Sequence, residues 1–205
     1  MTKLKLQNLN LKTGRLCLDF ANTLDWHASK HPIETLNSYA DLMAWARDVG
    51  LLSDRTAQQL AREANRHPAE AAATLEKARV VREVTYEIFV AVAHGGVPRP
   101  SDIAALNGTL ADLLSKSRLT RTNGGFDWNW GGDETALDQM LWWVIRSATD
   151  LMTSDELQRV GQCADEHGCG WLFLDTSKNR TRRWCAMKDC GNRAKARRYY
   201  KRLHT

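Results

Sequence analysis

The residues best suited to chemistry are two close pairs of cysteines near the C-terminal end of the chain. Five residues separate Cys163 from Cys169, four separate Cys185 from Cys190, and fifteen lie between the pairs. Each pair can supply two thiolates from one tight turn, and the spacer lets the chain return to the same point. The pattern therefore predicts one structural Zn2+ per chain, with Cys163, Cys169, Cys185 and Cys190 as its ligands.

The sequence alone leaves other interpretations of these cysteines open. They could be buried core residues or form two disulfides, and His167, which lies between two of them, could replace one ligand. The start of the chain does not resemble a secretory signal, so we expect a reducing cytoplasm in which thiols remain available for metal. Cys17 lies far from the other four and is expected to be a small core residue.

The segment between the two pairs has the pattern of a strand followed by a turn. Residues 171–174 are apolar, residues 175–179 are polar, and residues 182–184 lead into the second pair. This order predicts a β-hairpin, formed by the first and last of these stretches and clamped by the metal.

Positive charge is concentrated around and after the second pair. The 205-residue chain has a formal net charge of +5, yet residues 178–202 contain 11 Lys and Arg against one acid, Asp189, which gives +10. The other residues therefore sum to −5. A concentration of this kind is typical of a polyanion partner, and the alternative is a basic face that is only solvated.

Residues 193–203 are expected to form a helix, with Asn192 as its N-cap. Apolar residues recur on one face at helical spacing and predict a stripe that packs on the zinc hairpin: Ala196, Tyr199, Tyr200 and Leu203. Cations occupy the rest of the helix and would face outward. The predicted nucleic-acid contacts are Arg182, Arg183, Arg193, Lys195, Arg197, Arg198, Lys201 and Arg202.

Most of these cations should contact phosphates, because so dense a cluster matches backbone charge better than base edges. Arg193 lies next to the second cysteine pair. It could instead be fixed structurally, by hydrogen bonds to carbonyl groups of the ribbon.

The C-terminal segment also resembles a known family. The run 184–198 (WCAMKDCGNRAKARR) is similar to the CGNR zinc finger of bacterial stress-induced transcription regulators, and residues 171–175 (WLFLD) and 179–184 (NRTRRW) match it too. In that family the finger follows an α-rich domain called ABATE, and residues 18–23 (LDFANT) resemble the start of that domain. The resemblance covers essentially the whole chain and implies a zinc-dependent, DNA-binding regulator.

The remainder of the chain must position this segment, and its periodicity is mainly helical. We expect a helical domain over residues 1–155 and the finger over 156–205, the latter a zinc-bound hairpin plus helix of treble-clef or ribbon type. Apolar spacing and capping residues predict helices over residues 16–24, 38–50, 53–65, 69–94, 101–115 and 133–152, with Ser101 and Asp133 as starting residues for the last two.

One short ribbon interrupts these helices. Asn123-Gly-Gly125 is a hairpin turn signal between residues 119–122 and 126–130. Phe126, Trp128 and Trp130 alternate, so one face is aromatic. We expect this face to cover the helical core, with stacking on nucleic-acid bases as the alternative.

A pocket for a small-molecule effector is expected within the helical domain. Polar and aromatic residues within apolar periodic runs mark where a helical core could open. The candidates are Asn22, Trp26, Arg79, Arg82 and Trp142.

Motifs of common enzyme classes are not found in the sequence. There is no glycine-rich phosphate loop, Gly-x-Ser-x-Gly elbow or His-Glu-x-x-His, and no apolar run approaches the length of a membrane span. We therefore expect a cytoplasmic DNA-binding regulator whose helical domain senses a ligand or forms a homodimer. The alternative is a ligand-binding or enzymatic helical domain that carries the finger as a structural or docking module.

Overall fold

The computed structural model describes residues 9–122, 124–165 and 167–203, and helices dominate in them, as predicted. The helices are α2 (Leu16–Ala21), α3 (Tyr39–Asp48), α4 (Asp54–Arg66), α5 (Pro68–Ala93), α6 (Pro100–Ser115), α7 (Gln139–Met152) and α8 (Asn192–Leu203). The strands form antiparallel pairs: β1 (Leu24–Asp25) with β2 (Ile33–Glu34), β3 (Ser117–Thr122) with β4 (Gly125–Trp130), and β5 (Val160–Gln162) with β6 (Leu172–Leu174).

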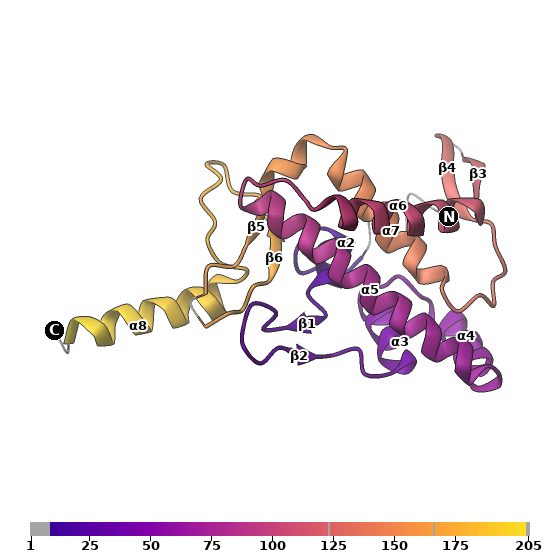
Figure 1. Cartoon of the computed structure of the whole chain (residues 1–205), viewed down its shortest axis with the longest axis horizontal. Coiled ribbons are helices and arrows are strands. Elements are labelled where there is room, and N and C mark those ends of the chain that lie inside the picture. Colours follow the sequence, from indigo (N-terminus) through magenta and orange to yellow (C-terminus); the bar gives the residue numbers. More distant parts are fainter. Residues whose placement is uncertain (1–8, 123, 166, 204–205) are drawn as a thin grey trace.

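The long helix α5 runs through the middle of the molecule, with α8 extending away at one end and the β3–β4 hairpin at the other (Figure 1). The main core lies where α5 meets α2, α3, α6 and α7. Phe20 of α2, Ile88 of α5 and Trp142 of α7 are almost completely buried there. None of the helices in the described ranges has the length and apolar character needed to cross a membrane.

Local signals in the sequence located the ends of α3, α4 and α5 well. Ser38 and Asp41 form a reciprocal capping box at the start of α3, and Gly50 follows its end with φ of +80°. The Ser53 hydroxyl accepts a hydrogen bond from the Thr56 N–H at the start of α4. These contacts satisfy N–H groups that the first turn of a helix leaves without partners.

The predicted starts of the next two helices were wrong. α6 begins at Pro100, so Ser101 lies inside it and does not cap it. α7 begins at Gln139 and not at Asp133. The Asp133 carboxylate accepts a hydrogen bond from the Thr135 N–H, and such a local side-chain bond competes with helix formation.

The β3–β4 hairpin forms as predicted, with Ser117 opposite Trp130 and Thr122 opposite Gly125. Asn123 of the predicted turn lies outside the described residues. The aromatic face does not cover the core as expected, since the exposed fraction of Phe126 is 70%. The helices α5, α6 and α7 already pack on one another, so only Trp130, at the base of the hairpin, reaches the core.

The hairpin of the C-terminal segment pairs differently from the prediction. β6 pairs with β5, which precedes the first two cysteines, and not with residues 182–184. This hairpin lies against α2 and α5, so that Val160 and Leu172 share a buried cluster with Leu18 and Phe89. The predicted boundary between residues 155 and 156 falls in a short 3₁₀ turn, Asp155–Arg159. The helical region and the cysteine-rich region are packed through a common core.

Asn22, at the end of α2, holds β6 in place. Its amide donates to the Leu172 carbonyl at 2.9 Å and accepts from the Leu172 N–H at 2.8 Å, in a buried site. Asn22 was predicted to contact an effector. Its side chain is instead bonded to the backbone of the cysteine-rich region.

Replacing Asn22 with Ala should leave both Leu172 groups buried without partners. We expect the free energy of unfolding to fall by about 1–3 kcal/mol, measured by urea denaturation. Asn37→Ala is the matched control, because Asn37 is exposed and donates only to the Glu34 carbonyl. Equal stability of Asn22→Ala and the unsubstituted protein would contradict this role.

Candidate metal centre and nucleic-acid interface

The four predicted cysteine ligands converge on one point. Their sulfur atoms all lie within 4.8 Å of one another, and the described residues contribute no histidine or carboxylate to this group. Cys185 Sγ lies 3.7 Å from Cys169 Sγ and 3.6 Å from Cys190 Sγ. A tetrahedral zinc site with Zn–S bonds of about 2.3 Å requires sulfur atoms roughly 3.8 Å apart. The geometry thus fits one zinc ion and four thiolates, and all the cysteines are free of disulfides.

Cys163 and Cys169 are positioned by the loop that joins β5 to β6. The Cys163 N–H donates to the Trp171 carbonyl at 2.8 Å, which closes the loop. Gly168 and Gly170 flank Cys169 with φ of +87° and +68°, a region that favours glycine. A Cβ atom at Gly168 would lie 2.6 Å from Ser29 Cα, so the loop also packs closely on the helical region.

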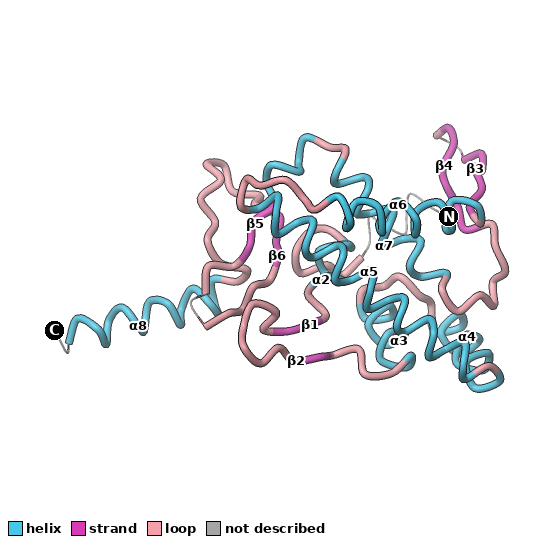
Figure 2. The backbone as a smooth tube through the Cα atoms, in the orientation of Figure 1, coloured by secondary structure: helices cyan, strands magenta, loops and turns pink. Residues whose placement is uncertain are grey.

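Cys185 and Cys190 are held by irregular backbone. Figure 2 shows that the chain from β6 to α8 runs mostly as loop, apart from a π-helical turn, Met187–Gly191, that contains Cys190. Few backbone hydrogen bonds stabilise such a segment by themselves. A metal ion bound by both cysteine pairs would fix it to the β5–β6 hairpin.

The electrostatics of the cluster favour a bound cation. Hydrogen bonds from the Cys169 and Cys185 thiols lower the pKa of Cys163, and donation of those bonds raises the pKa of Cys185. Without a metal, only part of the cluster can therefore ionise near neutral pH. A dication removes this conflict, because it attracts all four thiolates. Four protein ligands also close the coordination shell, as in structural zinc sites and unlike catalytic ones.

A buried carboxylate, Asp165, and two arginines of α8 support the cluster from outside. Arg193 donates to the Cys190 sulfur at 2.8 Å and to the Asp165 carboxylate at 3.0 Å, and Arg197 donates to the other Asp165 oxygen at 3.3 Å. Burial alone would raise the pKa of Asp165, but hydrogen bonds from the His167 N–H and Arg193 lower it below its usual value. The Asp165 carboxylate therefore anchors the first two turns of α8 to the first cysteine loop.

Arg182 also has a structural position. It donates to the carbonyl groups of Leu174, Trp184 and Cys185, and its guanidinium lies 4.4 Å from the centre of the Phe173 ring. The sequence had suggested bonds to carbonyls for Arg193, whose partners are in fact Asp165 and Cys190. Arg182, Arg193 and Arg197 thus bond to groups that hold the cysteine loops and α8 in place.

Four of the predicted contacts, including Arg197, line a basic cleft beside α8. The cleft has a volume of about 220 Å³, and its cationic walls are Arg183, Arg197, Arg198 and Lys201. The Trp184 ring lies 5.4 Å from the Arg183 guanidinium and 5.9 Å from that of Arg198. The indole therefore contacts two exposed arginines of this cleft.

The predicted packing of α8 was wrong. Tyr199, Tyr200 and Leu203 are about 60% exposed, because the helix projects away from the hairpin beyond its first turns (Figure 1). Asn192 does not act as an N-cap: the π-helical turn runs directly into α8, and the Asn192 amide donates back to the Lys188 carbonyl. The anchoring groups of α8 are therefore its arginines and not its apolar stripe.

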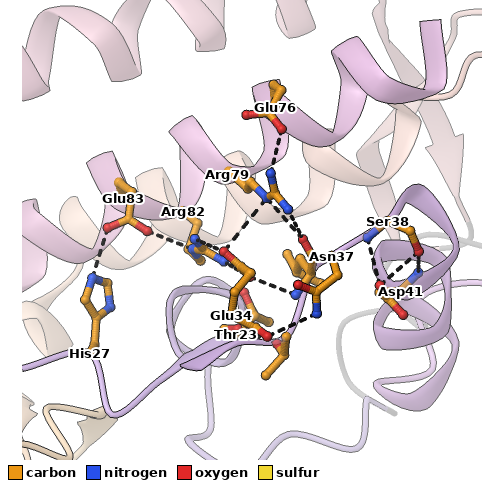
Figure 3. Close-up of polar contacts among 12 residues, drawn as sticks. Thr23, His27, Glu34, Asn37, Ser38, Asp41, Glu76, Arg79, Arg82 and Glu83 are labelled. Carbon is orange, nitrogen blue, oxygen red and sulfur yellow. Dashed lines mark hydrogen bonds and ion pairs between the residues drawn. The ribbon is translucent and has the colours of Figure 1, made fainter. Parts of the chain in front are cut away.

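The structure does not bring the five candidate effector contacts into one cavity. Figure 3 shows Arg82 between Glu34 and Glu83, with two hydrogen bonds of 2.6 and 2.7 Å to Glu34. Arg79 donates to the Leu36 carbonyl beside it. Both arginines thus fix the β2 region to α5. The prediction that they line a common effector pocket was wrong.

The remaining candidates are also separate. Trp142 is 2% exposed within the helical core, and Trp26 lies under Arg193, whose guanidinium is 5.0 Å from the ring. Asn22 lines a sizeable cavity, whose walls do not include the other four candidates. Asp165 was not among the residues predicted from the sequence, although an acid two residues after a predicted ligand, Cys163, was a usable signal.

Purified protein should contain one zinc ion per chain, measured by elemental analysis. The double substitution Cys185→Ser and Cys190→Ser should abolish zinc retention, and acid or a chelator should unfold the finger first, because the ligands must be deprotonated. Cys17→Ala is the control, since Cys17 is buried away from the cluster. Zinc retained in the double variant would exclude this ligand set.

Arg193→Met should weaken zinc binding by about 10–100-fold, the usual effect of losing a group that supports a metal ligand. Competition with a chromogenic chelator measures this. Lys195→Met is the matched control, because Lys195 is exposed and lies two residues further along α8. It should leave zinc affinity unchanged. Equal affinities for the two variants would show that the Arg193–Cys190 contact has no part in metal binding.

Comparison with protein families agrees with this geometry. Residues 14–155 match the ABATE family, described as "Putative stress-induced transcription regulator", and residues 159–203 match the CGNR zinc finger. No curated protein matches the chain significantly. Neither family description names a catalytic activity. The chain therefore belongs to the ABATE family and carries a C-terminal CGNR zinc finger whose four clustered cysteines fit one structural zinc ion.

Proposed function

We propose that this protein is a cytoplasmic, zinc-containing transcription regulator that binds double-stranded DNA through its finger and α8. The observation that carries this proposal is the placement of the basic charge. Residues 178–202 carry a net charge of +10 in a chain of +5, and α8 presents much of it on a helix that projects from the body (Figure 1). A projecting basic helix can approach a duplex without obstruction.

The cations divide into two groups with different roles. Arg182, Arg193 and Arg197 hold the finger together through the contacts described above. The other five predicted contacts are exposed and form the proposed DNA-binding surface: Arg183, Lys195, Arg198, Lys201 and Arg202. These five would neutralise phosphates, which gives affinity and orientation rather than base specificity.

The basic cleft is the best-formed part of this surface. Its volume is about 220 Å³, and three residues of the surface line it, Arg183, Arg198 and Lys201. A space of this size with three cationic side chains suits a phosphate group. Contacts with the Trp184 ring restrict the Arg183 and Arg198 side chains before any ligand binds. This arrangement reduces the ordering of side chains that phosphate binding requires.

Zinc would act here by fixing the position of α8. The ion would join the loops that carry both cysteine pairs, and Asp165 connects the first loop to α8 through Arg193 and Arg197. The helical domain, over residues 1–155 in this proposal, would then sense a ligand or pair two copies and alter DNA binding through the shared core.

DNA affinity should depend strongly on salt. Neutralisation of five phosphates gives a slope of log affinity against log salt of roughly −4 to −5. The triple variant Arg183→Ala, Arg198→Ala, Arg202→Ala should reduce the slope to about −2 and weaken binding to any sequence. Electrophoretic mobility or fluorescence anisotropy at several salt concentrations measures both quantities.

A control with the same change in net charge is available on α4. Arg55, Arg62 and Arg66 are exposed and lie on a helix far from α8, so their replacement by Ala should leave DNA affinity nearly unchanged. Zinc content should equal that of the unsubstituted protein in both triple variants. Equal losses of affinity in the two variants would show that only overall charge matters and would reject the contact assignment.

A second function is favoured by one observation, the exposed apolar face of α8. Tyr199, Tyr200 and Leu203 are each about 60% exposed, and such a stripe also suits docking to another protein. Absence of DNA binding by zinc-loaded protein, with every DNA pool tried, would favour this alternative.

A further inference from the structure

A cavity lies where the helical region meets the first cysteine loop. Its volume is about 570 Å³, and its walls include residues of α2, β1 and the end of α3 together with Trp171, two residues after Cys169. Cavities between two packed units of a chain are common binding sites for small molecules. The chemistry of the walls indicates which molecules would fit.

The walls are acidic and aromatic. Asp19, Asp25 and Asp48 contribute three carboxylates against one cation, Lys12. Two tryptophans, Trp45 and Trp171, also line it, together with uncharged residues such as Asn22 and Thr23. Carboxylates beside indole faces attract a positive charge attached to an apolar body.

The protein's own ammonium group already lies at this wall. Lys12 Nζ is 5.7 Å from the centre of the Trp171 ring, within the range of a cation–π contact. Lys12 is exposed and belongs to the segment before α2, so its side chain can move aside. The Lys12 side chain is itself an alkylammonium group, so its position shows that this wall accepts such a group.

The negative charge of the cavity is incompletely balanced. Burial raises the pKa of Asp19 to about 6, because N–H groups of Thr13 and Lys12, at 3.4 and 3.2 Å, offset the lost hydration only in part. The Asp48 carboxylate makes no hydrogen bond or ion pair with the described residues. A cationic ligand would supply the missing partner for these carboxylates.

We propose that this cavity binds a small organic cation, a primary amine or guanidinium carried on a flat or aliphatic body. The proposal deepens the sensing role proposed above and rests on it for its biological meaning. The Trp45 and Trp171 rings would contact the body of the ligand, and Asp25 and Asp48 would accept hydrogen bonds from its charged group.

The cavity is connected to the finger by direct contacts. Asp25 Oδ1 accepts a hydrogen bond from Trp171 Nε1 at 2.9 Å, and the neighbouring Trp26 lies under Arg193 at the start of α8. A ligand that alters the Asp25–Trp171 contact would act on both the cysteine loop and α8. By linkage, DNA would then change ligand affinity by the same factor by which the ligand changes DNA affinity.

The test uses full-length, zinc-loaded protein and three probes of nearly identical shape. Tyramine, tyrosol and 4-hydroxyphenylacetate share a phenol ring and end in an ammonium, a hydroxyl and a carboxylate group; agmatine supplies a guanidinium. Titration calorimetry should show tyramine or agmatine binding at least about tenfold more tightly than tyrosol, and no binding of the anion. Comparable binding of all three phenols, or no cation binding below about 1 mM, would overturn the proposal.

Substitutions at the carboxylates test the location of binding. Asp25→Asn keeps an oxygen that can accept from Trp171, and Asp48 is exposed and unbonded, so the variant Asp25→Asn, Asp48→Asn should fold and should weaken cation binding by about tenfold or more. The single variant Asp48→Asn should also weaken cation binding. It should fold normally, because Asp48 is exposed. Asp155→Asn is the control, an exposed carboxylate remote from the cavity walls. Equal affinity in the double variant and the control would place binding elsewhere.

DNA binding is measured on the same preparations without any cation ligand. DNA binding without binding of tyramine or agmatine would reject the cation site alone. Cation binding without DNA binding would reject the proposed function alone and leave the site in place.

Discussion

The convergence of four cysteine sulfurs is the constraint on which the C-terminal region of this structure, residues 160–203, depends. The segment from β6 to α8 has little regular structure, so regular backbone hydrogen bonding does not fix its path. Four sulfur atoms within 4.8 Å of one another can all be thiolates only around a cation. Metal binding and folding of this segment are therefore coupled, and the direction of α8 follows from that coupling.

The two regions of the chain do not act as independent bodies. Leu172 and Val160 of the β5–β6 hairpin share a buried cluster with Leu18 of α2, and the Asn22 amide satisfies the backbone of β6. The loop of Ala28 and Ser29 approaches Gly168 and Gly170 so closely that no side chain would fit there. A change in the helical region can thus reach the metal loop through packed atoms, which regulation by a ligand would require.

The cations of the finger fall into two groups. Those of one group are bonded to buried acceptors inside the protein, and those of the other are exposed. Arg193 and Arg197 lie against Asp165, whose side chain is fully buried, while Arg182 lies against backbone carbonyls. Removing one of these arginines would leave a buried acceptor without a partner, which would lower the free energy of unfolding by about 1–3 kcal/mol. Exposed cations such as Lys195 and Arg202 have no comparable structural cost, which leaves them suited to a polyanionic partner.

The sequence by itself determined those features that depend on neighbouring residues in the chain. Cysteine spacing predicted the metal group, periodicity and caps predicted α3, α4 and α5, and the glycine-rich turn predicted the β3–β4 hairpin. In each case the interacting groups lie within one segment, or belong to a motif whose spacing is itself the signal.

Only the tertiary structure decided which distant groups meet. Asn22 and Leu172 are 150 residues apart and Arg193 and Asp165 are 28 apart, and no local pattern distinguishes these partners from their neighbours. The same holds for the pairing of β5 with β6, the exposure of the α8 stripe and the acidic cavity beside Trp171. These features follow from how separately formed elements fill space and satisfy buried polar groups, which is a property of the packed molecule and not of any single segment.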